Sequence, residues 1–170
     1  MKTKRITICA MLIALNIVLC LLAPIEVLNF KLTFEAFPIL IAGIMLGPID
    51  GMIVGTMGSL IYQIYKYGIM VTTPLWVFPH LISGFIVGLY SKRHNYKLTT
   101  KQTIFITISS SMIVTILNTL AIYVDSKVNG YYTFIYVFGS ILIKIITNIV
   151  LSAFYSLIIP KLINNIKKIN

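Results

Sequence analysis

The chain has 170 residues, of which 58% are hydrophobic and only 11% are charged. These proportions exclude an ordinary soluble domain and indicate one integral membrane domain covering residues 1–170. The formal net charge of +10 would suit nucleic-acid binding on a soluble face, but here the basic residues lie between apolar segments, so we exclude nucleic acid as a partner and relate the charge to membrane orientation.

The first predicted membrane helix covers residues 6–22, directly after a basic N-terminus. An apolar segment of this length can cross a bilayer, and since no small-x-small cleavage site follows it, we interpret it as a retained helix instead of a secretory signal. Ala10 and Ala14 give it a small-xxx-small face, a pattern that lets a second helix approach closely. Cys9 and Cys20 lie about 16 Å apart along its axis, too far to pair, and are interpreted as apolar filler.

Residues 24–33 are predicted to form an external loop, followed by a short second helix at 34–46. Gly47 and Pro48 mark a tight turn, after which residues 51–65 form the third helix. Glycines spaced four residues apart predict that the second, third and fourth helices pack backbone to backbone; the pairs are Gly43 and Gly47, Gly51 and Gly55, and Gly84 and Gly88.

The remaining predicted helices cover residues 75–90, 104–124 and 134–159, and the last is expected to end before Pro160. The alternative is a five-span protein in which residues 34–65 form one long tilted helix. Cytoplasmic loops collect Lys and Arg. Six spans place most of the basic residues on the cytoplasmic side, whereas five spans place most of them outside. The sequence therefore predicts an all-α membrane protein, a six-transmembrane-helix bundle with both termini cytoplasmic.

Polar side chains recur at four-residue spacing along three of these helices and predict a partly polar cavity in the outer half of the bundle. Serine and threonine on membrane helices often bond only their own backbone, so the argument depends on three helices sharing the pattern. The loops at 24–33, 66–74 and 125–133 would close this cavity. The residues concerned are Thr56, Ser59 and Gln63; Thr107, Ser111, Thr115 and Thr119 with Asn118; and Ser140, Lys144, Asn148, Ser152 and Ser156.

The stretch at 62–90 interrupts the apolar sequence with polar and aromatic residues that are candidates for ligand contact. Tyr65 and Trp76 could stack on a flat ring, although these residue types also form the ordinary aromatic belt at membrane interfaces. His80 could donate to a ligand or serve as a structural residue. Lys144 is the one charged residue placed well inside a predicted span, where it would face an anionic group or extend to the interface.

The sequence offers little for catalysis. It contains no phosphate-binding glycine loop, no serine-hydrolase elbow, no zinc-binding histidine motif and no paired carboxylates. We therefore expect no cofactor, no metal and no enzyme activity. A small intramembrane enzyme, the less favoured alternative, would need His80, Asp50 and Cys9 to converge, and we expect these residues to be scattered.

Several of these features together resemble a known family. They are a basic N-terminus before a helix with two small residues, a short second helix with a tight turn after it, and a glycine-containing fourth helix: Ala10-x-x-x-Ala14, Phe37-Pro38-Ile39, Gly47-Pro48, Ser83-Gly84 and Gly88-Leu89-Tyr90. Over nearly the whole chain this pattern is similar to the substrate-binding S components of energy-coupling factor (ECF) vitamin transporters. Asn118-Thr119-Leu120 in the fifth helix makes the folate-type group the most similar one.

The resemblance implies a multi-pass protein of a prokaryotic plasma membrane that captures a water-soluble vitamin from outside. Such a component works with a transmembrane coupling subunit and two cytoplasmic ATPase subunits, and it topples in the membrane to release its ligand inside. The family's docking face for the coupling subunit carries over to Ala10 and Ala14. Folate is the favoured ligand, with thiamine, hydroxymethylpyrimidine and pantothenate as alternatives. The expected contacts are Tyr65, Trp76 and His80 for a ring, and Asn118, Lys144 and Asn148 for polar or anionic groups.

The sequence departs from the folate-type pattern where specificity would be set. An aromatic-Pro-Gly-Phe-Thr segment typical of the region before the fourth helix is replaced by Thr73-Pro74-Leu75-Trp76-Val77. Ser59 stands where the third helix often carries an acidic residue. An arginine common early in the sixth helix is absent, which leaves Lys144 as the nearby basic group.

Overall fold

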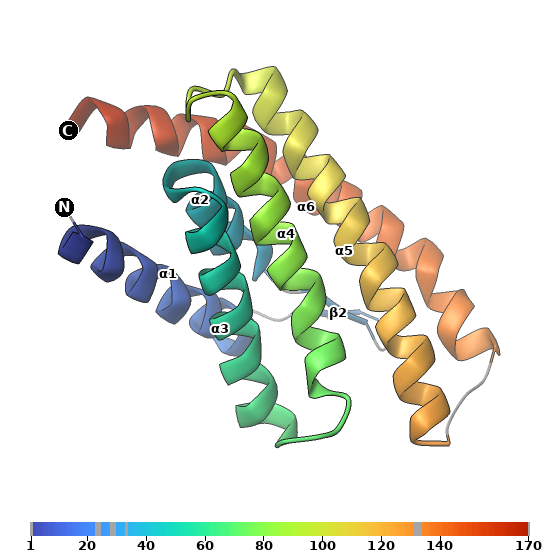
Figure 1. Ribbon diagram of the computed structural model, residues 1–170. Helices are drawn as coiled ribbons and strands as arrows, with labels where there is room; N and C mark the ends of the chain where they lie inside the picture. Colours follow the sequence, from blue (N-terminus) through green and yellow to red (C-terminus); the bar gives the residue numbers. More distant parts are fainter. Residues whose placement is uncertain (1, 23–24, 28–29, 33, 131–133, 170) are drawn as a thin grey trace.

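The computed structural model describes residues 2–22, 25–27, 30–32, 34–130 and 134–169, and within these the side chains of residues 3–22, 34–130, 145–147 and 149–163. Six helices and one short β-hairpin make up this part of the chain (Figure 1). The predicted all-α, six-helix architecture is confirmed. The elements are α1 Lys2–Leu22, β1 Ile25–Val27, β2 Phe30–Leu32, α2 Ala36–Leu46, α3 Pro48–Tyr67, α4 Thr73–Arg93, α5 Thr100–Val128 and α6 Phe134–Ile169.

Two elements differ from the predicted ones. The outer loop predicted at 24–33 contains the antiparallel β1–β2 pair, in which Glu26 lies opposite Lys31. Helix α6 has 36 residues and continues through Pro160 instead of ending before it, because a proline removes only one donor from a long helix and membrane helices tolerate this. At 1.5 Å per residue α6 is about 54 Å long, against about 30 Å for the hydrocarbon core, so part of it extends beyond that core.

Helix α2 is the centre of the fold. It has only 11 residues, and its Ile39, Leu40 and Ala42 side chains are at most 1% exposed. A helix that is apolar on all sides belongs in a core, and α2 contacts α1, α3, α4 and α6. The described helical segments that are long and apolar enough to cross a membrane are Thr3–Leu22, Thr73–Arg93, Thr100–Val128 and Ile145–Ile163.

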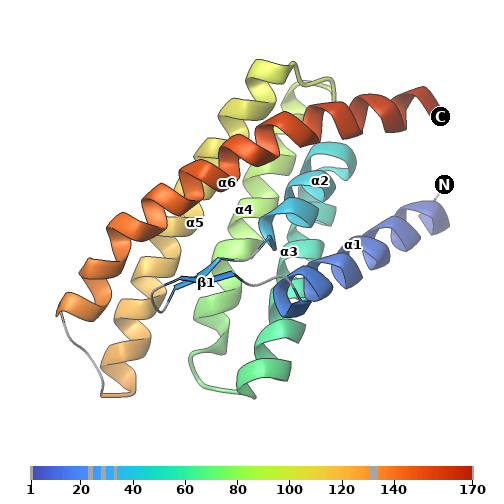
Figure 2. The same ribbon diagram turned by 180° about the vertical axis from the view of Figure 1, so that it is seen from behind.

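The helices form a bundle with distinct ends. Helices α3, α4 and α5 lie side by side (Figure 1), and α6 runs along the far side against α5 (Figure 2). The α3–α4 connection and the C-terminal end of α5 lie at one end, and the α4–α5 loop lies at the other. Both termini lie on the same side of the molecule in the two views. The distribution of basic residues predicts that this side faces the cytoplasm, and this orientation stays a prediction.

The glycine pairs allow α2, α3 and α4 to touch through their backbones. A Cβ on Gly84 would lie 2.1 Å from the carbonyl oxygen of Gly51, and one on Gly55 would lie 2.4 Å from that of His80. A Cβ on Gly43 would lie 2.9 Å from a side-chain methyl of Val87. Only a hydrogen fits in these gaps, so the predicted backbone-to-backbone packing is confirmed.

An ion pair fastens α1 to the start of α3. Arg5 Nε donates to the Asp50 carboxylate, and Arg5 Nη2 donates to the carbonyl oxygen of Leu46 at 3.0 Å. Asp50 lies in the first turn of α3, where a carboxylate also interacts favourably with the helix dipole. The N-terminal half of α1 is thereby held against the α2–α3 turn, and its C-terminal half reaches a second polar cluster.

Candidate functional site

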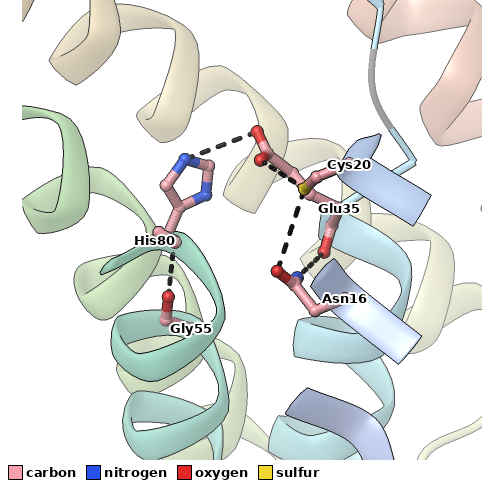
Figure 3. A network of polar contacts seen from close by, with 6 residues as sticks. Asn16, Cys20, Glu35, Gly55 and His80 are labelled. Atoms are coloured by element: carbon pink, nitrogen blue, oxygen red, sulfur yellow. Dashed lines mark hydrogen bonds and ion pairs between the residues drawn. The ribbon is translucent and has the colours of Figure 1, made fainter. Parts of the chain in front are cut away.

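Polar side chains from α1, α4 and the residue preceding α2 meet beside α3 (Figure 3). Glu35 directly precedes α2 and makes no side-chain capping bond with that helix. The Cys20 thiol donates to Oε2 of Glu35 at 3.3 Å, and Nε2 of His80 lies 3.4 Å from Oε1. Together with Asn16 these residues form what we call the Glu35 cluster: Asn16, Cys20, Glu35 and His80. Its carboxylate lies between three different segments of the chain.

Asn16 holds the backbone of Glu35 in place. Its side chain is fully buried, and Nδ2 donates to the carbonyl oxygen of Glu35 at 2.7 Å. Gly58 of α3 makes the room for this contact, since a Cβ there would lie 2.4 Å from Oδ1 of Asn16. A buried amide is costly in an apolar span unless it is bonded. We therefore assign Asn16 the role of positioning Glu35.

Two tyrosines, one on α3 and one on α6, also carry buried rings in this region. Tyr155 of α6 packs its ring against Phe37, two residues after Glu35, and Tyr62 of α3 packs against Tyr67. Tyr155 is only 1% exposed, and its hydroxyl has no hydrogen-bond partner in the described part of the chain. Buried polar atoms in folded proteins nearly always have a partner, which makes this hydroxyl a candidate contact for a bound molecule.

A cavity of about 520 Å³ opens where the α3–α4 connection meets the end of α5. Its volume falls in the range of about 300–1,000 Å³ that is typical of small-molecule sites. Thr73 and Trp76 line it from α4, and His80 follows on the same face of that helix. The cavity and the Glu35 cluster therefore share the α4 wall. The other lining residues are Gln63, Tyr67, Met70, Thr72, Asp125 and Asn129.

The structure brings two of the predicted site residues to this end of the bundle. Trp76 lines the cavity and His80 belongs to the Glu35 cluster. Asn118 of α5 has a buried Oδ1 without a partner among the described residues. Tyr65 is 76% exposed and does not line the cavity, whereas Tyr67 does. A ring-binding role for Tyr65 stays a prediction.

Two other groups of predicted residues lie elsewhere. Lys144 and Asn148 are on α6, and their side chains lie outside the described residues, as does that of Ser140. Ala10 and Ala14 are exposed on α1. Their predicted role in docking concerns a partner protein and stays a prediction as well.

The predicted polar stripes serve helix packing in part. The hydroxyls of Ser83 and Ser110 lie 2.7 Å apart between α4 and α5, and the Ser152 hydroxyl of α6 donates to that of Ser111 at 2.7 Å. Thr115 donates to the backbone of its own helix, at the carbonyl oxygen of Ser111. The two serine pairs therefore stabilise contacts between α4, α5 and α6, and none of these hydroxyls lines the cavity described above.

The prediction that Cys9, Asp50 and His80 lie far apart from one another is only partly correct. Cys9 interacts with the Asp50 carboxylate, so these two residues are neighbours, contrary to expectation. His80 contacts Glu35 instead. In the part of the chain that the structure describes, no group of three or more His, Cys, Asp or Glu side chains is arranged to hold a metal ion.

Sequence reasoning missed Glu35, Asn16 and the polar contact of Cys20. Cys20 is fully buried, as apolar filler would be, but its thiol also contacts the carboxylate. Asn16 could have indicated the cluster from the sequence, because burying an amide in the middle of an apolar span costs free energy unless the amide has a partner or a function. Cys20 follows it by four residues on the same helix face.

Comparison with known proteins agrees with the fold. A model of the family described as ECF transporter, substrate-specific component, matches residues 4–168. No curated protein matches the chain. The crystal structure of FolT bound with folic acid is similar with a TM-score of 0.69 and 21% sequence identity, covering 91% of each chain. The structure of the S component of a bacterial ECF transporter is similar with a TM-score of 0.72 and 25% identity, covering 98% of this chain and 99% of the other.

Proposed function

Because the chain belongs to the family of substrate-specific components of ECF transporters, we propose that it captures a water-soluble vitamin from outside the cell and hands it over for uptake. The observation that carries this proposal is the cavity of about 520 Å³ next to the Glu35 cluster, at the end of the bundle predicted to face outward. Its role is that of a binding component of a membrane transporter, not that of an enzyme.

Folate is the ligand we favour. A folate-type component would hold the pteridine ring against Tyr65, Trp76 and His80 and the polar or anionic groups at Asn118, Lys144 and Asn148. Trp76 in the cavity wall and His80 in the adjacent cluster support the ring site. FolT, whose structure was solved with folic acid, has a similar fold. Thiamine, hydroxymethylpyrimidine and pantothenate are the alternatives.

The partners and the transport cycle are also part of the proposal. The chain, acting as one domain in a prokaryotic plasma membrane with both termini cytoplasmic, would dock on a transmembrane coupling subunit that carries two cytoplasmic ATPase subunits. Toppling of the whole component would then expose the ligand to the cytoplasm. The exposed Ala10 and Ala14 on α1 support a docking face there.

The most direct test is to purify the protein in detergent from cells grown in vitamin-rich medium and to identify the co-purifying small molecule by mass spectrometry. We expect folate or a close derivative at about one molecule per chain. Recovery of thiamine, a pyrimidine or pantothenate would keep the transport function and replace the ligand. Protein that neither carries nor binds any vitamin in a calorimetric titration would refute the proposed function.

Replacement of Lys144 by methionine should weaken folate binding by about one to two orders of magnitude. A hydrogen bond to a charged group contributes roughly 1.5–3 kcal/mol, and about 1.4 kcal/mol corresponds to a tenfold change in affinity. Isothermal titration of the detergent-purified variant measures the effect. Lys161→Met removes an exposed lysine from the same helix and should leave the affinity unchanged. Equal affinities for wild type and Lys144→Met would remove Lys144 from the site.

A further inference from the structure

Toward the side chains that the structure describes, the Glu35 carboxylate has unused capacity to accept hydrogen bonds. An ionised carboxylate offers about four acceptor positions. Among the described residues its partners are the Cys20 thiol, a weak donor, and His80 Nε2 at a long 3.4 Å. The ion pairs in the described part of the chain join Arg5 to Asp50 and His80 to Glu35, so no described lysine or arginine neutralises this carboxylate. Strong acceptor positions therefore remain for a donor from outside the protein.

The carboxylate is also held in a fixed position. Asn16 bonds the backbone of Glu35 and Cys20 bonds its side chain, both from α1. The side chain of Glu35 is only 20% exposed, and that of His80 is 9% exposed. A recognition group fixed by its neighbours before binding loses less conformational freedom when a ligand arrives. The fixed and largely buried position of Glu35 therefore favours a role in ligand binding over that of a charge exposed to solvent.

The surroundings suit a flat ring. Trp76 lines the cavity and precedes His80 by four residues on the same face of α4. His80 in turn contacts Glu35. The Tyr155 hydroxyl is buried and has no partner in the described part of the chain, and its ring packs against Phe37, two residues after Glu35. The cavity wall therefore offers an aromatic side chain one helical turn away from the histidine that contacts the carboxylate.

We propose that Glu35 recognises the edge of a planar heterocycle that carries an amino group next to a ring N–H, as in 2-amino-4-oxopteridine. Two parallel donors of this kind match the two oxygens of a carboxylate, as a guanidinium group does. The inference depends on the proposed function, since it specifies the ligand class of the same site. It predicts that pantothenate, which has no such edge, does not bind.

Two pteridines that differ at one position test the assignment on the wild-type protein. 2-Amino-4-oxopteridine presents two donors to Glu35, whereas 2,4-dioxopteridine presents one donor and one carbonyl oxygen, which a carboxylate repels. In calorimetric competition against folic acid, we expect the amino compound to bind about tenfold more tightly than the dioxo compound. The dioxo compound loses one hydrogen bond that the site is built to make, and this loss accounts for the difference. Equal binding of the two pteridines would refute the role of Glu35.

The substitution Glu35→Gln should reverse this preference. A glutamine side chain offers one acceptor and one donor, which complements the dioxo compound. We expect folic acid to bind about 10- to 100-fold more weakly and 2,4-dioxopteridine to become the better competitor. Asp50→Asn removes the same charge at the other end of the molecule and should preserve the wild-type preference. If the glutamine variant fails to fold, Glu35→Asp, which keeps a carboxylate, must still prefer the amino compound.

The outcomes separate this inference from the proposed function. Wild-type protein that binds folic acid, together with a Glu35→Gln variant of unchanged affinity and unchanged preference, would refute the inference and leave folate transport intact. Wild-type protein that binds neither folic acid nor 2-amino-4-oxopteridine would refute both the inference and the folate assignment.

Discussion

Replacing Gly84 with alanine is expected to destabilise the protein by about 3 kcal/mol or more, at the upper end of what overpacked cores show. The added Cβ would lie 2.1 Å from the carbonyl oxygen of Gly51. Both groups belong to helix backbones, so no side chain can turn aside to relieve the overlap. Helices α3 and α4 would have to separate along the most extensive helix contact in the described bundle. The thermal unfolding midpoint in detergent measures the effect.

Two other substitutions make this test specific. Gly43→Ala should cost less, because its closest neighbour is a methyl group of Val87, and the added substitution Val87→Ala should recover part of the loss. Met57→Leu changes a 42% exposed side chain of α3 and should leave the midpoint unchanged. A wild-type midpoint for Gly84→Ala would show that α3 and α4 do not touch through these glycines.

The features that sequence reasoning predicted well depend on neighbours along the chain. The lengths of the apolar segments predicted the helices, and the four-residue spacing of the glycines predicted the close contact of α2, α3 and α4. Segment length and glycine spacing can each be read within a single helix. Pro160 was misleading for the same reason. A proline inside a long membrane helix removes one donor without ending the helix, and nothing in the local sequence separates that case from a true stop.

The candidate site depends on contacts that local patterns do not contain. Asn16 reaches Glu35 across 19 positions, and Ser152 reaches Ser111 across 41. Which side chains meet is decided by how the helices cross and by where Gly58 leaves room for Asn16. Sequence reasoning therefore singled out His80 and Trp76 as candidates, because they stand out by residue type. It overlooked Glu35, because a glutamate beside a helix start looks ordinary.

Helix α1 has two faces with different neighbours. The residues that point inward recur at three- or four-residue spacing and are buried: Cys9, Leu12, Asn16 and Cys20. The other face carries two small residues, Ala10 and Ala14, which are exposed beside large exposed apolar side chains such as Met11 and Val18. Small residues on an outward face allow a partner helix to approach closely within a membrane. The proposed docking face can therefore be changed without touching the proposed ligand site.

The double substitution Ala10→Trp and Ala14→Trp should therefore strongly reduce uptake while preserving binding. Each indole would occupy space that a closely packed partner helix needs, and at about 1–3 kcal/mol for each overpacked position we expect vitamin uptake to fall by about two orders of magnitude. Uptake is measured in proteoliposomes that contain the coupling and ATPase subunits, and binding by titration in detergent. Ala153→Trp, at an exposed alanine of α6, is the matched control and should retain uptake. Wild-type uptake by the double variant would place the docking face elsewhere, whereas a parallel loss of ligand affinity would show that the two faces of α1 are not independent.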